Sequence, residues 1–247
     1  MSDHKETPLP RGVNNITMQQ SKQRVSVIVP THNEAGTIAE VVHELVKHTP
    51  SLIEVLVIDD GSKDGTADIA EKAGARVIRM AVNGGKGKAI QRGIHESAGD
   101  VLVFIDGDGQ DDPQETPQLL EALVPSVDMV IGSRFLGNFE HGSITMLNRI
   151  GTHCLTTTLN RLFGVAITDP IAGFRVIRKR ALSGCLISAH RYDIEVDILL
   201  ALLERGRRVV EVPVTRYPRT YGSTDLSSFV DGGRILRRIL SRRVRLS

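Results

Sequence analysis

The sequence predicts an α/β protein with a Rossmann-like, mostly parallel sheet flanked by helices. From residue 25 onward, short apolar runs alternate with amphipathic stretches, and polar, glycine-containing motifs follow the first four runs. Strands that alternate with helices in this way form doubly wound parallel sheets. Because such sheets bind ligands beyond the carboxyl ends of their strands, the motifs predict a binding site at one sheet edge.

The first half of the chain contains four expected strands and three expected helices. The strands are the apolar runs at 25–30, 54–59, 75–80 and 100–106. The helices are 34–48, 64–73 with Asp64 as its cap, and 85–98. In 34–48 the apolar residues recur at helical spacing, which indicates that one side of this helix packs on the sheet.

The second half is less regular but keeps the same alternation. Strands are expected at 127–133, 174–179 and 208–216. Helices are expected at 143–163, at 193–206 where Gly206 ends the helix, and at 227–246. We therefore divide the chain into a polar tail at 1–23, expected to be disordered, one domain at 24–226, and a basic amphipathic helix at 227–247.

The overall composition excludes several classes of protein. A formal net charge of only +2 over 247 residues gives no reason to expect a nucleic-acid partner. Cys154 and Cys185 stand in no metal-binding spacing, which is typical of a reducing, cytoplasmic compartment. The longest apolar stretches, such as 198–203, are far shorter than the roughly 20 residues of a membrane span. We expect a protein that is soluble or peripheral on the cytoplasmic membrane face and does not span the membrane; a homo-oligomer is left open.

The strongest chemical signal is FIDGDGQDDP at 104–113, directly after the fourth expected strand. Asp106, Asp108 and the amide of Gln110 offer oxygen ligands, which Mg²⁺ and Mn²⁺ prefer. An EF-hand is excluded because Asp111 and Pro117 stand where that loop needs Gly and Glu. The alternative is a solvated acidic loop.

Three further motifs follow the other strands of the first half. They are PTHNEAG at 30–36, VIDDGSKDGT at 57–66 and NGGKGKA at 83–89. Asp60 could accept a hydrogen bond from a nucleotide base, and the turn after it lets a ligand approach the backbone. Each motif alone could be an ordinary turn, but four successive strand ends of this kind predict a shared ligand site.

Together these motifs resemble the family 2 glycosyltransferases of the GT-A fold, and within them the dolichyl- or polyprenyl-phosphate sugar synthases for mannose, glucose or N-acetylglucosamine. The resemblance covers about residues 24–240. Its motifs are PTHNE (30–34), DDGSKDGT (59–66), NGGKGKA (83–89), DGDGQ (106–110), GSR (132–134), Arg149, DPIAGFR (169–175), YDIE (192–195), EVPV (211–214) and RTYGST (219–224).

The resemblance implies a role for each matching residue. Nucleotide contacts would come from Pro30, Glu34, Asp60, Lys86 and Asp106. The metal, Mg²⁺ or Mn²⁺, would be held by Asp106, Asp108 and Gln110. Phosphate or acceptor contacts would come from Arg149, Arg175, Arg219 and Ser223; structural pairing with carboxylates is the alternative for Arg134, Arg149 and Arg175. Catalytic roles would belong to Asp108, Arg134, Arg149 and Glu195.

The resemblance also implies the reaction: metal-dependent transfer, with inversion, of a hexose or N-acetylhexosamine from a UDP- or GDP-sugar to a polyprenyl phosphate. One residue departs from the subgroup pattern, because Asp225 stands where a lysine usually lies near the acceptor phosphate. A soluble hydroxyl or phosphate acceptor is therefore an alternative, and for a hydroxyl Glu195 is the candidate base. A third alternative is a non-catalytic subunit that binds a nucleotide-sugar.

The C-terminal helix carries a further expectation. No acidic residue follows Asp231, and six arginines stand in the last fourteen positions. On a helical wheel one side carries Ile235, Leu236, Ile239, Leu240, Val244 and Leu246. Most of the arginines lie opposite, with Arg243 intruding. The helix either packs on the domain with a solvated basic face or binds an anionic membrane surface.

Overall fold

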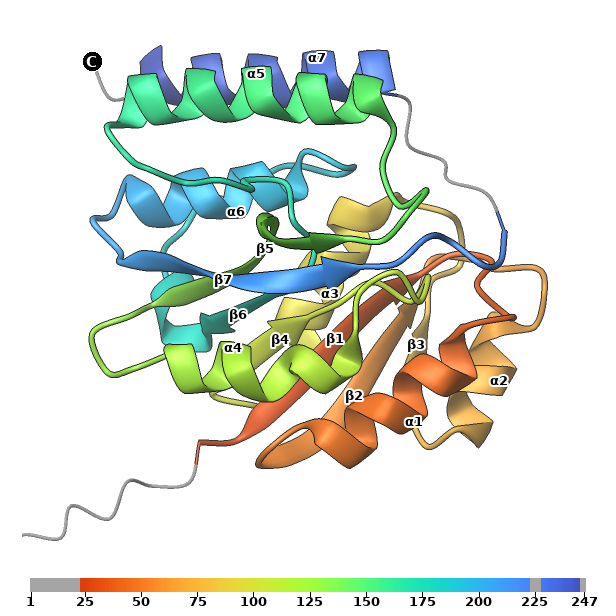
Figure 1. Cartoon of the computed structure of the whole chain (residues 1–247). Helices are drawn as coiled ribbons and strands as arrows, with labels where there is room; N and C mark the ends of the chain where they lie inside the picture. Colours follow the sequence, from red (N-terminus) through yellow and green to blue (C-terminus); the bar gives the residue numbers. More distant parts are fainter. Residues whose placement is uncertain (1–22, 223–227, 245–247) are drawn as a thin grey trace, which may run out of the picture.

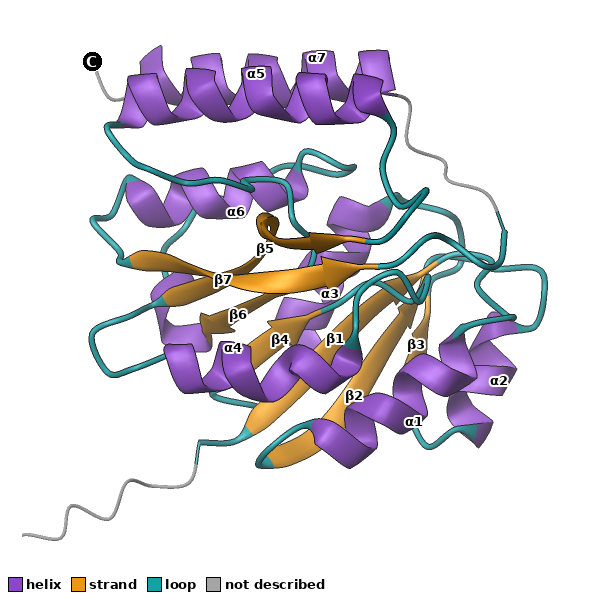
Figure 2. Ribbon diagram, viewed as in Figure 1, coloured by secondary structure: helices purple, strands orange, loops and turns teal. Residues whose placement is uncertain are grey.

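The computed structural model describes residues 23–222 and 228–244 and has a single mixed sheet with helices on both faces (Figures 1 and 2). The strands are β1 (Val25–Thr31), β2 (Leu52–Asp59), β3 (Arg76–Arg79), β4 (Val101–Phe104), β5 (Met129–Phe139), β6 (Arg175–Arg178) and β7 (Val209–Arg216). The helices are α1 (Ile38–His48), α2 (Thr66–Lys72), α3 (Lys86–Glu96), α4 (Thr116–Ala122), α5 (Met146–Phe163), α6 (Ile194–Leu203) and α7 (Ser228–Val244). Short 3₁₀ turns, η1 (Pro113–Glu115) and η2 (Lys179–Leu182), complete the order.

The sheet confirms the predicted α/β class and its mostly parallel character. Its strand order is β3-β2-β1-β4-β6-β5-β7. Strands β1 to β4 are parallel to one another, and β7 is parallel to β5. Among the strands of the described residues, only β6 is antiparallel to both of its neighbours. The carboxyl ends of β1, β2 and β4 therefore meet at one edge, as the motif positions predict.

Two apolar layers hold the helices on the sheet. Along β1, Val27 and Val29 face the cluster under α1, α2 and α4, whereas Ile28 faces the cluster under α3 and α6. This alternation is the period-two geometry of a strand, and both faces are apolar because both are covered. Helices α5 and α7 lie side by side outside α6 and form an outer layer (Figure 1).

Most predicted elements are present, with boundaries that differ by a few residues. Helix α4 was not predicted, because its seven residues follow directly on the acidic loop and prolines stand at 113 and 117. Strand β5 runs on to Phe139 through an irregularity between Ser133 and Asn138. The predicted tail at 1–23 lies almost wholly outside the described residues.

Helix α7 corrects the helical-wheel prediction. Ile235 and Ile239 are buried, as expected, but Leu236 and Leu240 are 38% and 47% exposed. Arg242 is buried, 5% exposed, and faces α6. The prediction that the arginines lie opposite the packed side is wrong for Arg242 and Arg238. Arg242 follows Ile235 by about two helical turns, so helical spacing places it on the packed side with that residue. Both arginines pair with Asp197 of α6, and Arg238 also pairs with Asp193 just before α6.

Candidate active site

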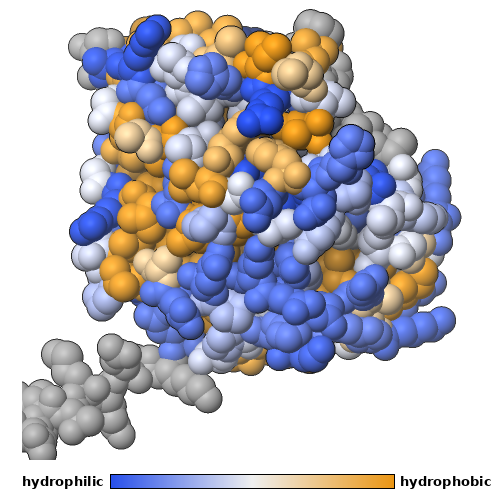
Figure 3. Space-filling view, in the orientation of Figure 1, coloured by the Kyte–Doolittle hydropathy of each residue, from blue (hydrophilic) through white to orange (hydrophobic). Residues whose placement is uncertain are grey.

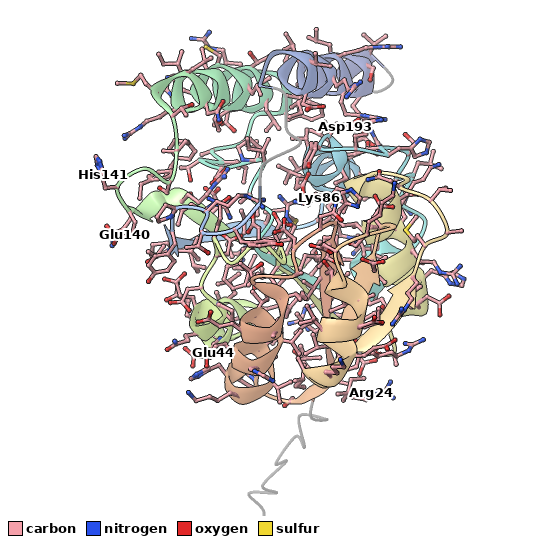
Figure 4. The ribbon with its side chains drawn as sticks, turned by 90° about the vertical axis from the view of Figure 1, so that its right-hand side faces the viewer. Arg24, Glu44, Lys86, Glu140, His141 and Asp193 are labelled. Carbon is pink, nitrogen blue, oxygen red and sulfur yellow. The ribbon has the colours of Figure 1, made fainter. Side chains whose placement is uncertain are left out.

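The predicted site residues converge where β1, β2 and β4 end. Figure 4 looks onto this edge of the sheet, with Lys86 near the middle, between the layer of α1 and α2 and the outer layer of α5 and α7. Lys86 is the first residue of α3, and Gly85 before it has φ 90°, a conformation that favours glycine. The glycine-rich motif thus starts the helix and turns Lys86 toward the end of β4.

Lys86 bridges two carboxylates. Its Nζ lies 2.7 Å from Asp106 Oδ1 and 2.8 Å from Glu195 Oε1, in the first turn of α6. Burial opposes the charge on Lys86, but the two carboxylates outweigh it and raise its pKa. Burial likewise opposes ionisation of Asp106, yet Lys86 lowers the pKa of that carboxyl. At neutral pH, Asp106 is therefore ionised beside a protonated lysine.

Arg219 joins a second pair of acids. Its Nη2 donates to Asp108 Oδ2 at 2.9 Å, and its Nη1 donates to Glu34 Oε1 at 2.8 Å. Glu34 comes from the loop after β1 and Asp108 from the loop after β4, so Arg219 ties two strand ends together. Burial raises the pKa of Glu34 although Arg219 opposes the rise.

Two site residues were not singled out from the sequence. Arg216, at the end of β7, lies 2.9 Å from Asp111 and donates to Gln110 Oε1 at 2.8 Å. Asp111 is buried, and burial raises its pKa despite Arg216. Asp111 stands inside the motif at 104–113, so its position was a usable signal. Arg216 is the last residue of β7, far along the chain from this motif, and nothing in its local sequence marked it as a site residue.

Arg134 is held in place by a chain of acidic groups. Its Nε and Nη2 donate to the two oxygens of Asp169 at 2.6 and 2.8 Å. Glu211, on β7, in turn accepts from the main-chain N–H of Asp169 at 2.9 Å. The bidentate geometry orients the guanidinium, and the second carboxylate fixes the loop that carries the first. Asp169 and Glu211 lie within motifs recognised in the sequence.

Asp60 lies at the end of β2 and binds the neighbouring loop. Its two carboxylate oxygens accept from the main-chain N–H groups of Gly84 and Gly85, both at 2.7 Å. The side chain thus shapes the turn that precedes Lys86. Pro30 lies one residue before the end of β1 and is buried.

Of the remaining predicted residues, Arg175 lies behind the cluster and binds the main chain of Glu195, whereas Arg149 lies on the surface. Arg175 is 1% exposed and donates to the main-chain oxygens of Ala172 and Glu195, and burial lowers its pKa to about 10. Arg149 is exposed on the first turn of α5, 5.8 Å from the centre of the Phe139 ring. Ser223 lies outside the described residues.

The donor set fits a hard divalent cation. Among residues 23–222 and 228–244 no group of three or more His, Cys, Asp or Glu side chains is arranged to hold a metal. Asp106 and Asp108 supply two carboxylates, and Mg²⁺ or Mn²⁺ bound by one or two carboxylates keeps positions for water and phosphate oxygens. Gln110 lies beside them, but its amide is engaged at both ends, by Arg216 and by the Tyr217 carbonyl at 3.0 Å.

Comparison with known proteins agrees with this geometry. Residues 26–186 match the family described as glycosyl transferase family 2. Glycosyltransferase AglJ of Haloferax volcanii is 34% identical over 211 residues, covering 85% of this chain and 68% of the relative. The undecaprenyl-phosphate mannosyltransferase of Micrococcus luteus is 32% identical over 220 residues, covering 85% and 90%.

A solved structure has the same fold. The glucosyl-3-phosphoglycerate synthase of Mycobacterium tuberculosis, in complex with Mn²⁺, UDP and glucosyl-3-phosphoglycerate, superposes with a TM-score of 0.72 at 25% identity. The match covers 89% of this chain and 80% of that one. With the family match extending over most of the chain, the protein belongs to glycosyl transferase family 2 and is a glycosyltransferase.

Proposed function

We propose that the protein transfers a hexose or N-acetylhexosamine, with inversion, from a UDP- or GDP-sugar to a polyprenyl phosphate and uses Mg²⁺ or Mn²⁺. The observation that carries this proposal is the pair of carboxylates, Asp106 and Asp108, set among cationic side chains at the carboxyl ends of parallel strands. The synthase from M. tuberculosis, solved with Mn²⁺ and UDP on this fold, supports the metal and a nucleotide donor.

In this proposal the cationic residues act on the donor diphosphate. A divalent ion held by Asp106 and Asp108 would stabilise negative charge on the leaving group. Lys86 and Arg219 already contact those carboxylates, so their side chains lie within reach of a diphosphate bound to the same ion. Arg134, oriented by Asp169, would add a third fixed cation. Preorganised charges of this kind stabilise the transition state without reorganising during the reaction.

The surroundings of Glu195 support a phosphate acceptor. A hydroxyl acceptor needs a general base, whereas a phosphate monoester with a second pKa of about 6 is already largely ionised near pH 7. Glu195, the base candidate, is 4% exposed and its Oε1 lies 2.8 Å from Lys86 Nζ. A carboxylate that already pairs with a largely buried lysine is better suited to positioning that lysine than to accepting a proton from an incoming acceptor.

The names of the relatives support a lipid phosphate as the acceptor, whereas Asp225 favours a second candidate acceptor. The relative from M. luteus is an undecaprenyl-phosphate mannosyltransferase, and a 31% identical relative from Mycolicibacterium smegmatis is a polyprenol monophosphomannose synthase. An acidic residue at 225 would repel an anionic acceptor by about 1 kcal/mol in water and more at a lower dielectric. A soluble phosphate or hydroxyl acceptor is therefore the second candidate, and the synthase from M. tuberculosis was solved with a soluble product.

The direct test is a panel of labelled UDP- and GDP-sugars, each incubated with and without polyprenyl phosphate in the presence of Mg²⁺ or Mn²⁺. We expect one donor to yield a lipid-soluble labelled product that does not form after chelation of the metal. Preferential labelling of a soluble alcohol, sugar or phosphate would replace the lipid acceptor with the second candidate. A protein that neither transfers nor hydrolyses any donor would contradict the whole proposal.

We further propose peripheral docking on a membrane through the outer layer. Among the described helices, none has both the length and the apolar character of a membrane span. Figure 3 shows hydrophobic residues gathered on the face of the molecule that carries α5 and β7, while the surface over α1 and α4 is mostly hydrophilic. Exposed apolar side chains of the outer layer are Met146, Leu147 and Ile150 on α5 and Leu236, Leu240 and Val244 on α7. Exposed Arg237 and Arg243 could add attraction to anionic lipid, at about 1 kcal/mol each.

For docking we expect Leu240→Glu to weaken co-sedimentation with phosphatidylglycerol vesicles by at least several-fold, because it places a charge on the apolar face that would enter the bilayer. The matched control is Val46→Glu on α1, which changes an apolar side chain of similar exposure, 52%, on another face. Equal binding of the two variants would rule out this face. Removal of the helix after Asp231 is a poor test, since it also strips Ile235 and Ile239 from the core.

A further inference from the structure

Arg242 of helix α7 points into the molecule and pairs with acidic side chains there. Arg242 donates to Asp197 Oδ1 from Nη2 at 2.6 Å and from Nε at 3.1 Å, and it contacts Glu204 at 2.7 Å. Asp197, on α6, is fully buried. Removing two charges from water is costly, so a buried pair is weak evidence of a purely stabilising role. What else Asp197 binds therefore matters.

The second oxygen of Asp197 holds the segment that precedes α6. Its Oδ2 accepts from the main-chain N–H groups of Ser188 and Ala189 at 2.7 and 2.9 Å. Arg238, one turn before Arg242, donates to the Ser188 hydroxyl at 2.7 Å. Two arginines of α7 and one aspartate of α6 thus fix the course of residues 188–189.

Residues 189–190, which continue the same segment, contact the start of α3. The Gln91 amide donates to Ala189 O at 2.6 Å, and the Gly87 N–H donates to His190 O at 3.1 Å. That N–H belongs to the first turn of the helix, where no partner within the helix exists. A Cβ added to Gly87 would lie 2.5 Å from Ala189 O, so the backbone of the segment lies directly against this turn of α3.

Lys86 lies directly beside this contact. Gly85 and Gly87 flank it, and a Cβ on Gly85 would meet His190 O at 2.6 Å. The Lys86 ammonium then reaches Asp106 and Glu195 in the site. Glu195 and Asp197 are two residues apart on α6, and one carboxylate faces Lys86 while the other faces α7. Figure 4 shows Lys86 below α6 and Asp193 above it, toward the outer layer.

We propose that Asp197 and Arg242 are positioning residues for Lys86, so that α7 is part of the donor site rather than only an outer cover. The connection runs from Arg242 to Asp197, through the backbone of 188–190, to the first turn of α3. Loss of the ion pair lets the 188–190 segment move, which loosens the turn that aims Lys86. The assignment rests on the proposed function in one respect: the ligand of Lys86 is taken to be a nucleoside diphosphate with its metal.

The test compares Arg242→Met with the wild-type full-length chain by hydrogen–deuterium exchange and by calorimetry with Mn²⁺ and UDP or GDP. We expect faster exchange in residues 85–91 and nucleotide affinity lower by on the order of tenfold, because a small misplacement of a catalytic charge is costly. Arg242→Lys, which keeps the charge but cannot bind two atoms at once, should recover part of the affinity.

Two controls separate positioning from general stability. Ile239→Val removes one methylene from the same α7 interface without touching the ion pair, and Arg161→Gln removes an exposed arginine from α5. Both should leave the exchange of 85–91 and the nucleotide affinity unchanged. If Ile239→Val lowers affinity as much as Arg242→Met does, or if exchange at 85–91 is unaltered in Arg242→Met, the positioning role is overturned.

The exchange measurement needs no ligand, so it judges the connection even if the wild-type protein binds neither nucleotide and the proposed function fails. If Arg242→Met does not fold, Gln91→Met serves instead, because it cuts the same connection at the contact with Ala189. Unchanged exchange at the Gly87 amide in that variant would equally overturn the proposal.

Discussion

Asp108→Asn should abolish metal-dependent sugar transfer while the fold survives. The substitution keeps the volume of the side chain and an oxygen that can accept from the Gln110 N–H, now 3.0 Å from Asp108 Oδ1. It removes one of the two carboxylates proposed to hold the metal. Because a bound metal contributes several kcal/mol to charge stabilisation, turnover with Mn²⁺ or Mg²⁺ should fall on the order of 10³-fold.

The control is Asp112→Asn in the same loop. Asp112 accepts from the Gln114 N–H at the start of η1, and asparagine can make the same bond. This variant should keep wild-type turnover, and circular dichroism should show both variants folded. Near-normal metal-dependent activity of Asp108→Asn would remove this residue from the metal site and with it the central feature of the proposal.

Lys86→Met should have the largest effect on stability. The substitution leaves Asp106 and Glu195 facing each other without the ammonium that now lies 2.7 and 2.8 Å from them. Breaking a buried ion pair by removing one partner costs about 3–5 kcal/mol. We expect the free energy of unfolding to fall by about 3 kcal/mol. The loss lies at the lower end of this range because the Asp106 side chain keeps 22% of its surface exposed and is partly solvated.

Urea denaturation of Lys86→Met beside Lys88→Met measures this effect. Lys88 is exposed two residues further along α3, so its loss should change stability by less than about 0.5 kcal/mol. Nucleotide binding should also be lost in Lys86→Met and kept in Lys88→Met. A Lys86→Met protein as stable as wild type would mean that the ion triad contributes little to holding the site together.

The meeting of Glu34, Lys86, Asp106 and Asp108 could be predicted from the sequence. Each follows a strand of the first half, and parallel strands bring their carboxyl ends to one edge. The alternation of apolar runs with amphipathic helices also identified the class of sheet. These signals are local in the chain, since hydrophobic periodicity and glycine-containing turns report on the backbone around them.

The roles of the individual charges could not be predicted in the same way. From the sequence alone, an arginine implies only that its side chain needs an acidic or hydrogen-bonding partner if it is buried. Arg242 meets Asp197 across 45 positions, and Arg219 meets Glu34 across 185. Nothing in either local pattern distinguishes such a partner from solvent or a membrane surface, so the acidic partners of Arg238 and Arg242 could not be predicted, although helical spacing places Arg242 on the same side as Ile235.

The sequence by itself determined the α/β class, the edge of the sheet that carries the site and the carboxylate pair at its centre. Only the tertiary structure decided that β6 runs antiparallel, that Glu195 faces Lys86, and that Arg238 and Arg242 of α7 meet Asp193 and Asp197. The physical reason is the same in each case. A strand buried on both faces has the same apolar pattern in either direction, and a charged side chain is compatible with water or with a buried partner until the fold brings one of them to it.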